Sequence, residues 1–293
     1  MDLLAALFQV VAPVFALAAV GFVWVRRGHA YDTAFVTRLS MTISLPCLVF
    51  IALARTDVDP GLLADTVLAA TIAYVGVGLL AWLVVVVGRL DVPTYWAPIT
   101  FGNTGNLGLP IALFAFGQFG FDLAVVVFAV MAILSFTFGV WVVSGGGSPV
   151  AAIREPIVWG TVAGIVFMLT GWPIPVWAGN AIELVGQIAI PLMLITLGVA
   201  ISRLQPRAIG KATVISLIRL VICLSVPIGV GLWFELPPVP LAVLIVQIST
   251  PVAVTSYMLA AKYHARADEV AGLVVVSTLL SLITIPATLA FFV

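Results

Sequence analysis

FGNTGNLGLPIALFAFG, residues Phe101–Gly117, places two asparagines, several glycines and a proline in a chain otherwise dominated by Leu, Val, Ala and Ile. Proline removes a backbone donor and clashes with the preceding turn, and glycine adds backbone freedom. A buried asparagine amide costs roughly 2–7 kcal/mol unless it is hydrogen-bonded. Irregular backbone at membrane depth persists only where protein or a water-filled cavity covers it. The stretch therefore predicts a discontinuous helix that faces the interior of a membrane protein.

The composition supports a membrane protein with little room for a soluble domain. Hydrophobic residues make up 63% of the 293 residues and charged residues 8%, whereas soluble domains carry about 25% charged residues. The formal net charge is zero, so no nucleic-acid partner is expected. Cys47 and Cys223 lie in apolar runs, which favours buried hydrophobic side chains over a disulfide or a metal site. Without a Walker loop, a nucleophile–base pair or a ligand cluster, we expect no metal, no cofactor and no enzymatic activity.

Ten segments are long and apolar enough to cross a bilayer, which takes about 20 residues. They cover residues 3–25, 34–54, 62–88, 94–117, 122–143, 156–172, 178–201, 209–233, 239–261 and 268–292. The basic residues of the loops gather at one end of the alternating spans, and the other end holds Arg55 alone. The positive-inside rule then places both termini outside the cytoplasm, and we expect a bacterial inner membrane.

Two similar halves are expected on either side of the loop Ser144–Glu155, SGGGSPVAAIRE, whose Gly and Ser favour a flexible cytoplasmic linker. Residues 1–143 form the first half and residues 156–293 the second. Five spans in each half would give the halves opposite orientations, as in inverted-repeat transporters. Proline pairs recur at similar offsets: Pro13 and Pro156 are 143 residues apart, Pro46 and Pro191 145, and Pro110 and Pro251 141. We therefore predict an all-α membrane protein of ten transmembrane helices in two inverted five-helix repeats.

The second half contains a counterpart of the opening stretch in Gln247–Ala260, QISTPVAVTSYMLA, where polar residues again flank a proline. Two broken helices that cross near the midplane would aim two half-helix N-termini, each with a partial positive charge, at one place. Such a crossover could bind an anion without a fixed cation. The predicted binding residues are Asn103, Thr104, Asn106, Pro110, Gln247, Thr250, Pro251, Thr255 and Ser256. The alternative is that these residues only kink helices and hold them together.

These motifs resemble the auxin efflux carrier family, which includes plant PIN-type auxin carriers and bacterial carriers of malate and malonate. NTGNLGLPIALFAFG is similar to the family's fourth span, IPLMLITLGVAI to its seventh and VQISTPVAVTSYMLAAKY to its ninth. The resemblance, to a bacterial member, implies ten spans in two inverted repeats with crossing fourth and ninth helices, a fold shared with bile-acid symporters. It implies that Asn103, Pro110 and Pro251 are crossover residues. Thr255 stands where bacterial members often have Asn.

Three further polar residues are candidates for substrate binding or coupling. Arg219 lies in the eighth span, about 12 Å deeper than Lys211 at 1.5 Å per residue. The sequence favours a side chain that snorkels to the cytoplasmic surface over one that reaches the site. Glu183 and Gln187 lie one turn apart near the outer end of the seventh span, where we expect solvated side chains rather than a proton relay.

The sequence thus predicts a secondary transporter of small organic anions by alternating access: mono- or dicarboxylates such as malate or malonate, or auxin-like acids. By family analogy, spans 1–2 and 6–7 form a scaffold or dimer face and the other spans a moving core. The sequence does not decide whether H⁺ or Na⁺ is the coupling ion, or whether the protein forms a homodimer. The alternatives are a sodium-coupled symporter of the bile-acid type and a non-transporting receptor or scaffold. The lack of a mid-span carboxylate argues against sodium/proton exchange, and the two predicted breaks argue against a receptor.

Overall fold

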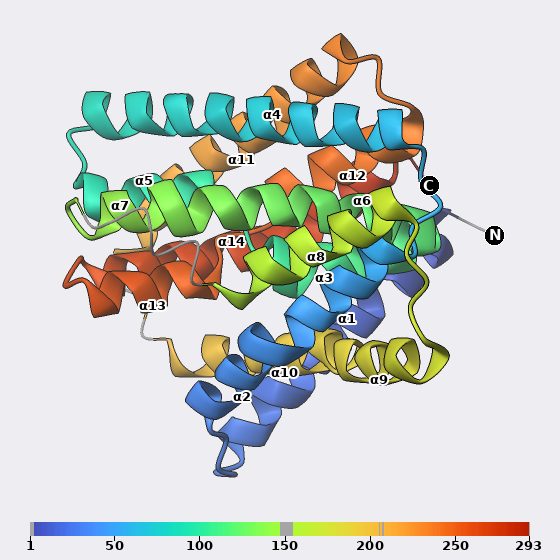
Figure 1. Cartoon of the computed structure of the whole chain (residues 1–293). Coiled ribbons are helices and arrows are strands. Elements are labelled where there is room, and N and C mark those ends of the chain that lie inside the picture. The colour runs from blue at the N-terminus through green and yellow to red at the C-terminus, as the bar shows by residue number, and fades with distance from the viewer. Residues whose placement is uncertain (1–2, 147–154, 205, 207, 293) are drawn as a thin grey trace.

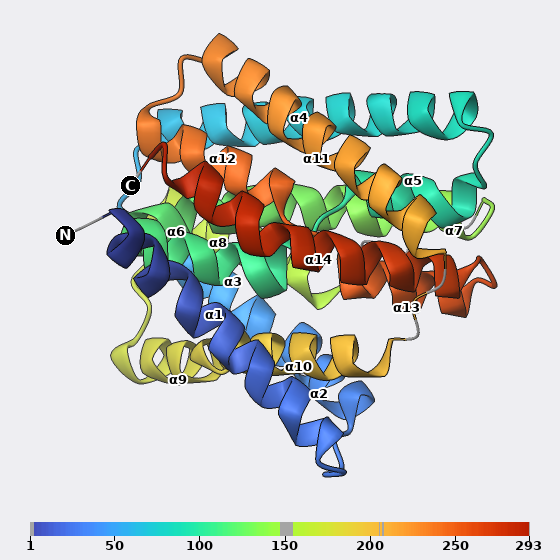
Figure 2. The same cartoon turned by 180° about the vertical axis from the view of Figure 1, so that it is seen from behind.

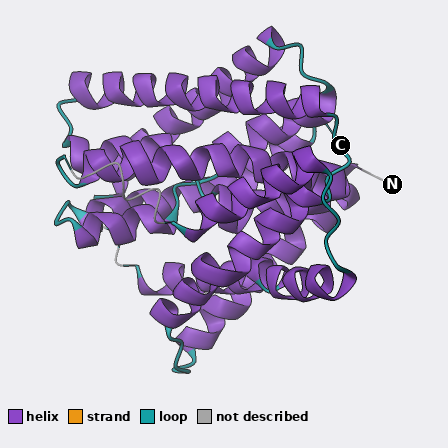
Figure 3. Ribbon diagram, viewed as in Figure 1, coloured by secondary structure: helices purple, strands orange, loops and turns teal. Residues whose placement is uncertain are grey.

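The protein is built from helices joined by short loops (Figure 1, Figure 3). A computed structural model describes residues 3–146, 155–204, 206 and 208–292, so most of the predicted linker, residues 147–154, lies outside the described residues. The α-helices are α1 (Leu3–Arg26), α2 (Thr33–Leu39), α3 (Leu45–Ala54), α4 (Pro60–Val87), α5 (Val92–Thr100), α6 (Leu109–Leu134), α7 (Val140–Val143), α8 (Pro156–Thr170), α9 (Val176–Gln187), α10 (Ala189–Arg203), α11 (Ile209–Trp233), α12 (Pro238–Ser249), α13 (Val254–Lys262) and α14 (Ala267–Leu289). Three π-helical turns, η1 (Ser40–Ser44), η2 (Thr104–Gly108) and η3 (Ser135–Gly139), precede α3, α6 and α7.

Several helices have the length and composition of membrane spans. Within the described residues, seven helical stretches are long and apolar enough: Leu7–Arg26, Thr33–Ala54, Pro60–Val87, Thr104–Val143, Val176–Arg203, Ile209–Trp233 and Ala267–Leu289. The apolar helices α8 and α12 are shorter. Leu79, Val87 and Ile283 expose most of their side-chain surface. Long helices with exposed apolar side chains suit lipid rather than water, so the chain is an integral membrane protein.

Two of the expected spans fall on one helical stretch. Thr104–Val143 covers part of the range 94–117 and all of the range 122–143, and Gly117 divides it because its φ of 65° and ψ of −159° are not helical. Glycine takes this conformation without the steric cost that a side chain would meet. The range 239–261 contains two helices, α12 and α13, with irregular backbone between them.

Two close helix pairs bring the first part of the chain against the second. α1 packs along α10, and α3 packs along α8. Small residues make these approaches possible: a Cβ atom on Gly21 would lie 2.0 Å from the Ile195 carbonyl oxygen, and one on Gly160 would lie 2.7 Å from the Pro46 carbonyl oxygen. Helices that touch backbone to backbone in this way gain van der Waals contact without bulky side chains between them.

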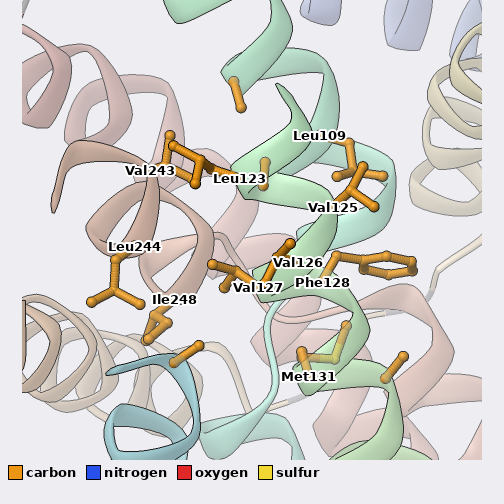
Figure 4. Close-up of a cluster of buried hydrophobic side chains, with 14 of the residues drawn as sticks. Leu109, Leu123, Val125, Val126, Val127, Phe128, Met131, Val243, Leu244 and Ile248 are labelled. Carbon is orange, nitrogen blue, oxygen red and sulfur yellow. The ribbon is translucent and has the colours of Figure 1, made fainter. Parts of the chain in front are cut away.

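A buried apolar cluster holds α6 against α12 in the centre of the molecule (Figure 4). Leu123 and Val127 of α6 and Leu244 of α12 are fully buried there. α11 packs against α4, α12 and α14 and covers this core from behind (Figure 2). The start of α1 and the end of α14 lie at the same end of the protein in both views.

Candidate functional site

The two predicted helix breaks meet inside the protein. After α5 the chain is extended at Phe101, with φ −104° and ψ 124°, and it becomes helical again at Thr104. After α12 it is non-helical until Val254. Gly102 and Val252 form an isolated antiparallel bridge, and the Asn103 N–H donates to the Pro251 carbonyl oxygen at 2.7 Å. The second break thus supplies the acceptor for a backbone N–H group that the first break leaves without a helical partner.

A glycine is required where the breaks touch. A Cβ atom on Gly102 would lie 2.3 Å from the Thr250 hydroxyl oxygen, 2.8 Å from the Thr250 carbonyl oxygen and 3.0 Å from Nη2 of Arg219. Real Cβ atoms do not make contacts as short as the first two, so any other residue would push the two breaks apart. The Val252 N–H is used as well, because it donates to the Ser277 hydroxyl at 3.0 Å. The backbone N–H groups of Asn103 and Val252 are therefore paired within the protein.

A cavity of about 260 Å³, called here the crossover cavity, lies against both breaks. The first break lines it with Gly102, Asn103, Gly105 and Asn106, and the second with Ala253, Thr255 and Ser256. Phenylalanine and methionine side chains form much of the remaining wall: Met41, Phe101, Phe128, Met131, Phe136 and Met258. The cavity therefore combines a polar side, at the start of two half-helices, with an apolar side. Such starts carry unpaired N–H groups and partial positive charge, which favour anions.

Asn103 is the residue that points most directly to a ligand. Its side chain is 5% exposed and lines the crossover cavity. The amide nitrogen Nδ2 has no hydrogen-bond partner among the described residues. Buried polar atoms are nearly always paired in native proteins, by protein, water or ligand. A donor left unpaired at the wall of a cavity is suited to an acceptor that enters the cavity, such as a carboxylate oxygen.

The predicted binding residues separate into two groups. Asn106, Thr255 and Ser256 line the cavity with Asn103 and are half-buried. Thr104, Gln247 and Thr250 are fully buried and do not line this cavity. The Thr250 hydroxyl donates to the Gln247 carbonyl oxygen, and the Gln247 amide lies where a Cβ on Gly108 would come within 2.3 Å of its Oε1. These three residues are packed inside the crossover, away from the crossover cavity.

Pro110 does not lie at the first helix break. The break is at residues 101–103, whereas Pro110 is the second residue of α6 and follows the π-turn Thr104–Gly108. The Leu109 N–H bonds to the carbonyl of Thr104, five residues back. The wider π-turn leaves room where a proline ring would clash with an α-helical carbonyl four residues earlier. The prediction that Pro110 interrupts the helix is therefore wrong, while Pro251 does lie in the second break.

Arg219 does not snorkel. Its side chain is 3% exposed, and Nε donates to the carbonyl oxygen of Pro98, in the last turn of α5, at 3.1 Å. Nη2 has no partner among the described residues and lies beside Gly102. The guanidinium therefore occupies the side of the crossover away from the cavity wall, next to a cavity of about 10 Å³ lined by Ser249 and Ser277. The structure places a fixed cation at the crossover, where the sequence predicted none.

Glu183 and Gln187 are not brought to the crossover. They line a separate cavity of about 570 Å³ with Arg55, Gln118 and Asp122. Glu183 pairs with Arg55 at 2.7 Å, and the two side chains are 42% and 45% exposed. The Gln187 amide approaches the Glu183 carboxylate at 3.4 Å. An exposed pair of this kind contributes little to stability, about 0–1 kcal/mol.

Sequence reasoning missed Glu155 and the aromatic wall of the cavity. Glu155 ends the predicted linker and yet lines the crossover cavity. Phe128 and Phe136 lie in a long apolar stretch where every residue resembles lipid-facing helix. No local pattern in the sequence separates cavity-facing from lipid-facing phenylalanine, because the distinction depends on which helices pack together.

Comparison with known proteins links the chain to membrane transport. A model of the family described as membrane transport protein matches residues 142–289, which include the second break. The chain is also 27% identical, over 267 residues, to a protein of Methanothermobacter thermautotrophicus (strain Delta H) described as an uncharacterized transporter. That alignment covers 87% of each of the two chains, so the similarity extends to the first break as well as the second.

Proposed function

Since this chain belongs to the membrane transport protein family, the family of the auxin efflux carriers, we propose that it is a secondary transporter that carries small organic anions by alternating access. The observation that carries the proposal is the unpaired, buried Nδ2 of Asn103 at the wall of the crossover cavity. Two half-helices begin at this crossover, and the buried Arg219 guanidinium lies beside Gly102, on the side away from the cavity. Donor, helix ends and cation all favour one negatively charged group at this place.

The walls of the cavity favour a monocarboxylate with an apolar body. One side presents amide and hydroxyl groups of Asn103, Asn106 and Thr255, and the opposite walls are largely Phe and Met. A second carboxylate on the substrate would face apolar side chains, which cannot replace its hydration. Glu155 would also repel it. Aromatic or branched monocarboxylates, including auxin-like acids, are therefore preferred over malate and malonate.

We further propose two inverted repeats, residues 1–143 and 156–293, joined by the linker 144–155. The helix pairs support this arrangement. If α1 corresponds to α8 and α10 corresponds to α3 in the two repeats, the contact between α1 and α10 corresponds to the contact between α8 and α3, and both contacts are present. Gly21 contacts α10 and Gly164 contacts α3, and 164 − 21 is 143, the offset between Pro13 and Pro156. These two pairs would form a scaffold against which the crossover helices move. Both termini are proposed to lie outside the cytoplasm of a bacterial cell.

Flux into liposomes tests the transport function. The purified full-length chain would be reconstituted, and uptake of phenylacetate, indole-3-acetate, malonate and malate measured with pH and sodium gradients imposed separately. The expected result is flux of the two monocarboxylates above protein-free liposomes, and its loss in Asn103→Ala. Binding of an acid without flux would indicate a receptor, and flux that requires sodium would favour a sodium-coupled symporter. If the protein neither transports nor binds any of the four acids, the proposed function is overturned.

A further inference from the structure

Glu155 is the only ionisable residue among the described residues that line the crossover cavity. It occupies the N-cap position of α8, with φ −75° and ψ 124°, and its side chain makes no capping hydrogen bond. The N-terminal N–H groups and the dipole of a helix attract negative charge, but the Glu155 side chain accepts no hydrogen bond from the N–H groups of α8. The carboxyl group is therefore not used as a helix cap, and it is half-buried at the cavity wall.

Few charged groups of the described residues surround Glu155. α8 packs against α3, η1 and α6. α3 and α6 contribute one ionisable residue each, Cys47 and Asp122, and Asp122 lines the other cavity; η1 contributes none. The basic neighbour is Lys262, at the end of α13, the helix that carries Thr255 and Ser256. Burial raises the pKa of the Glu155 carboxyl above its ordinary value, and the Lys262 ammonium opposes that rise.

We propose that Glu155 is a proton-binding residue of the crossover cavity, so that a proton and a carboxylate anion occupy the cavity together. This inference rests on the proposed function, because it concerns the same cavity. An ionised Glu155 and a bound anion place two negative charges in one enclosed space, which disfavours both. A protonated Glu155 removes this repulsion and can donate a hydrogen bond. By linkage, protonation strengthens anion binding, and the bound anion in turn strengthens protonation by the same factor.

The sign of the pH effect follows directly. The fraction of protonated Glu155 rises as the pH falls through its folded-state pKa, so anion affinity is higher at low pH and is lost as the pH rises. A simple carboxylic acid titrates near pH 4–5 and stays anionic above pH 5.5. We expect affinity to fall about tenfold as Glu155 loses its proton, which corresponds to a repulsion of about 1.4 kcal/mol between the two negative charges.

The experiment measures binding of radiolabelled phenylacetate to the purified full-length chain between pH 5.5 and 8.5. Wild type should show the fall in affinity, and Glu155→Gln should bind with an affinity that does not change with pH and is no weaker than that of wild type at pH 5.5. Glu155→Asp keeps a titrating carboxylate and should keep the pH dependence. The matched control is Glu183→Gln, in the other cavity, which should behave as wild type. Binding in weakly buffered solution should also take up protons in wild type and not in Glu155→Gln.

Each outcome decides the inference. If Glu155→Gln keeps the wild-type pH profile, or if Glu183→Gln is the variant that loses it, Glu155 is not the proton site, while the proposed function stands. If Glu155→Gln does not give a monodisperse protein, proton uptake by wild type and by Glu155→Asp decides, and no uptake on binding overturns the inference. If wild type binds no acid of the panel at any pH, the proposed function itself fails.

Discussion

The backbone N–H of Asn103 donates a hydrogen bond of 2.7 Å to the carbonyl oxygen of Pro251, and this bond ties the two helix breaks together. The main chain of Asn103 is thus committed to the fold, while its side-chain Nδ2 is unpaired at the cavity. One residue therefore has two separable roles. A substitution that keeps the backbone leaves the crossover joined and removes only the donor to the cavity.

Asn103→Ala should weaken carboxylate binding by about ten- to a hundredfold and leave the protein folded. A hydrogen bond to a charged group is worth roughly 1.5–3 kcal/mol, and about 1.4 kcal/mol corresponds to a tenfold change in affinity. The measurement is phenylacetate affinity per folded protein, with monodispersity as the check on folding. Asn180→Ala, at an exposed position on α9, is the matched control and should be neutral. Wild-type affinity in Asn103→Ala would show that the Asn103 side chain does not bind the carboxylate and only packs in the crossover.

Arg219→Met should weaken binding of an acid at least fivefold and change binding of the corresponding neutral amide little. The guanidinium lies beside Gly102, so its charge acts on the cavity through a thin layer of backbone in a poorly screened interior. Arg219→Lys should fall between, because lysine keeps the charge but loses the Nε–H that donates to the Pro98 carbonyl oxygen. Lys211→Met, on the same helix, is the control. Equal losses for acid and amide would show that Arg219 acts only on the fold.

Gly102→Ala should destabilise the protein by about 1–3 kcal/mol and abolish most transport, because the new methyl group overlaps Thr250. Gly210→Ala, where a Cβ meets nothing within 4 Å, is the matched control and should be tolerated. Adding Thr250→Ala to Gly102→Ala removes the hydroxyl that the methyl group meets at 2.3 Å, and should recover part of the stability. Wild-type thermal stability and flux in Gly102→Ala would contradict the close approach of the two breaks.

The orientation in the membrane can be tested with single cysteines in a Cys47→Ala/Cys223→Ala background. Ser144→Cys should react with a membrane-impermeant maleimide only after the membrane is permeabilised. Asp57→Cys, in the exposed loop before α4, should react in intact cells. The reason is the charge asymmetry of the loops, which retains basic segments in the cytoplasm. The opposite labelling pattern would invert the proposed orientation.

The sequence predicted the helical membrane fold and the existence of both breaks, since apolar length and the polar residues around Asn103 and Pro251 are local signals. It did not locate the first break at residues 101–103 within that stretch, because a sequence shows Pro110 but not the π-turn that accommodates it. The sequence favoured an Arg219 side chain that reaches the membrane surface. It could not show the acceptor, the Pro98 carbonyl, because the position of that carbonyl depends on how α5 packs against α11. Glu155 was assigned to a linker, because the contact of α8 with the cavity is tertiary.

The two prolines of the crossover stretches should now behave differently, and comparing them tests the site directly. Pro251 lies in the second break, where it supplies the carbonyl that accepts from Asn103. In Pro251→Ala the new N–H could bond to the Gln247 carbonyl four residues back, which at present accepts from the Thr250 hydroxyl. That bond would extend α12 into the break, and alanine is the better helix former.

Pro251→Ala should therefore lower phenylacetate affinity about tenfold or more without loss of folded protein, because a continuous helix turns the start of α13, with Thr255 and Ser256, away from the cavity. Pro110→Ala is the matched control. It lies within a helix that is already continuous from Thr104, so adding an N–H should stabilise or leave unchanged both fold and affinity. Binding measurements on the two variants at one pH suffice. Equal losses in both would mean that the prolines act on general helix packing, and no loss in either would remove the second break from the binding site.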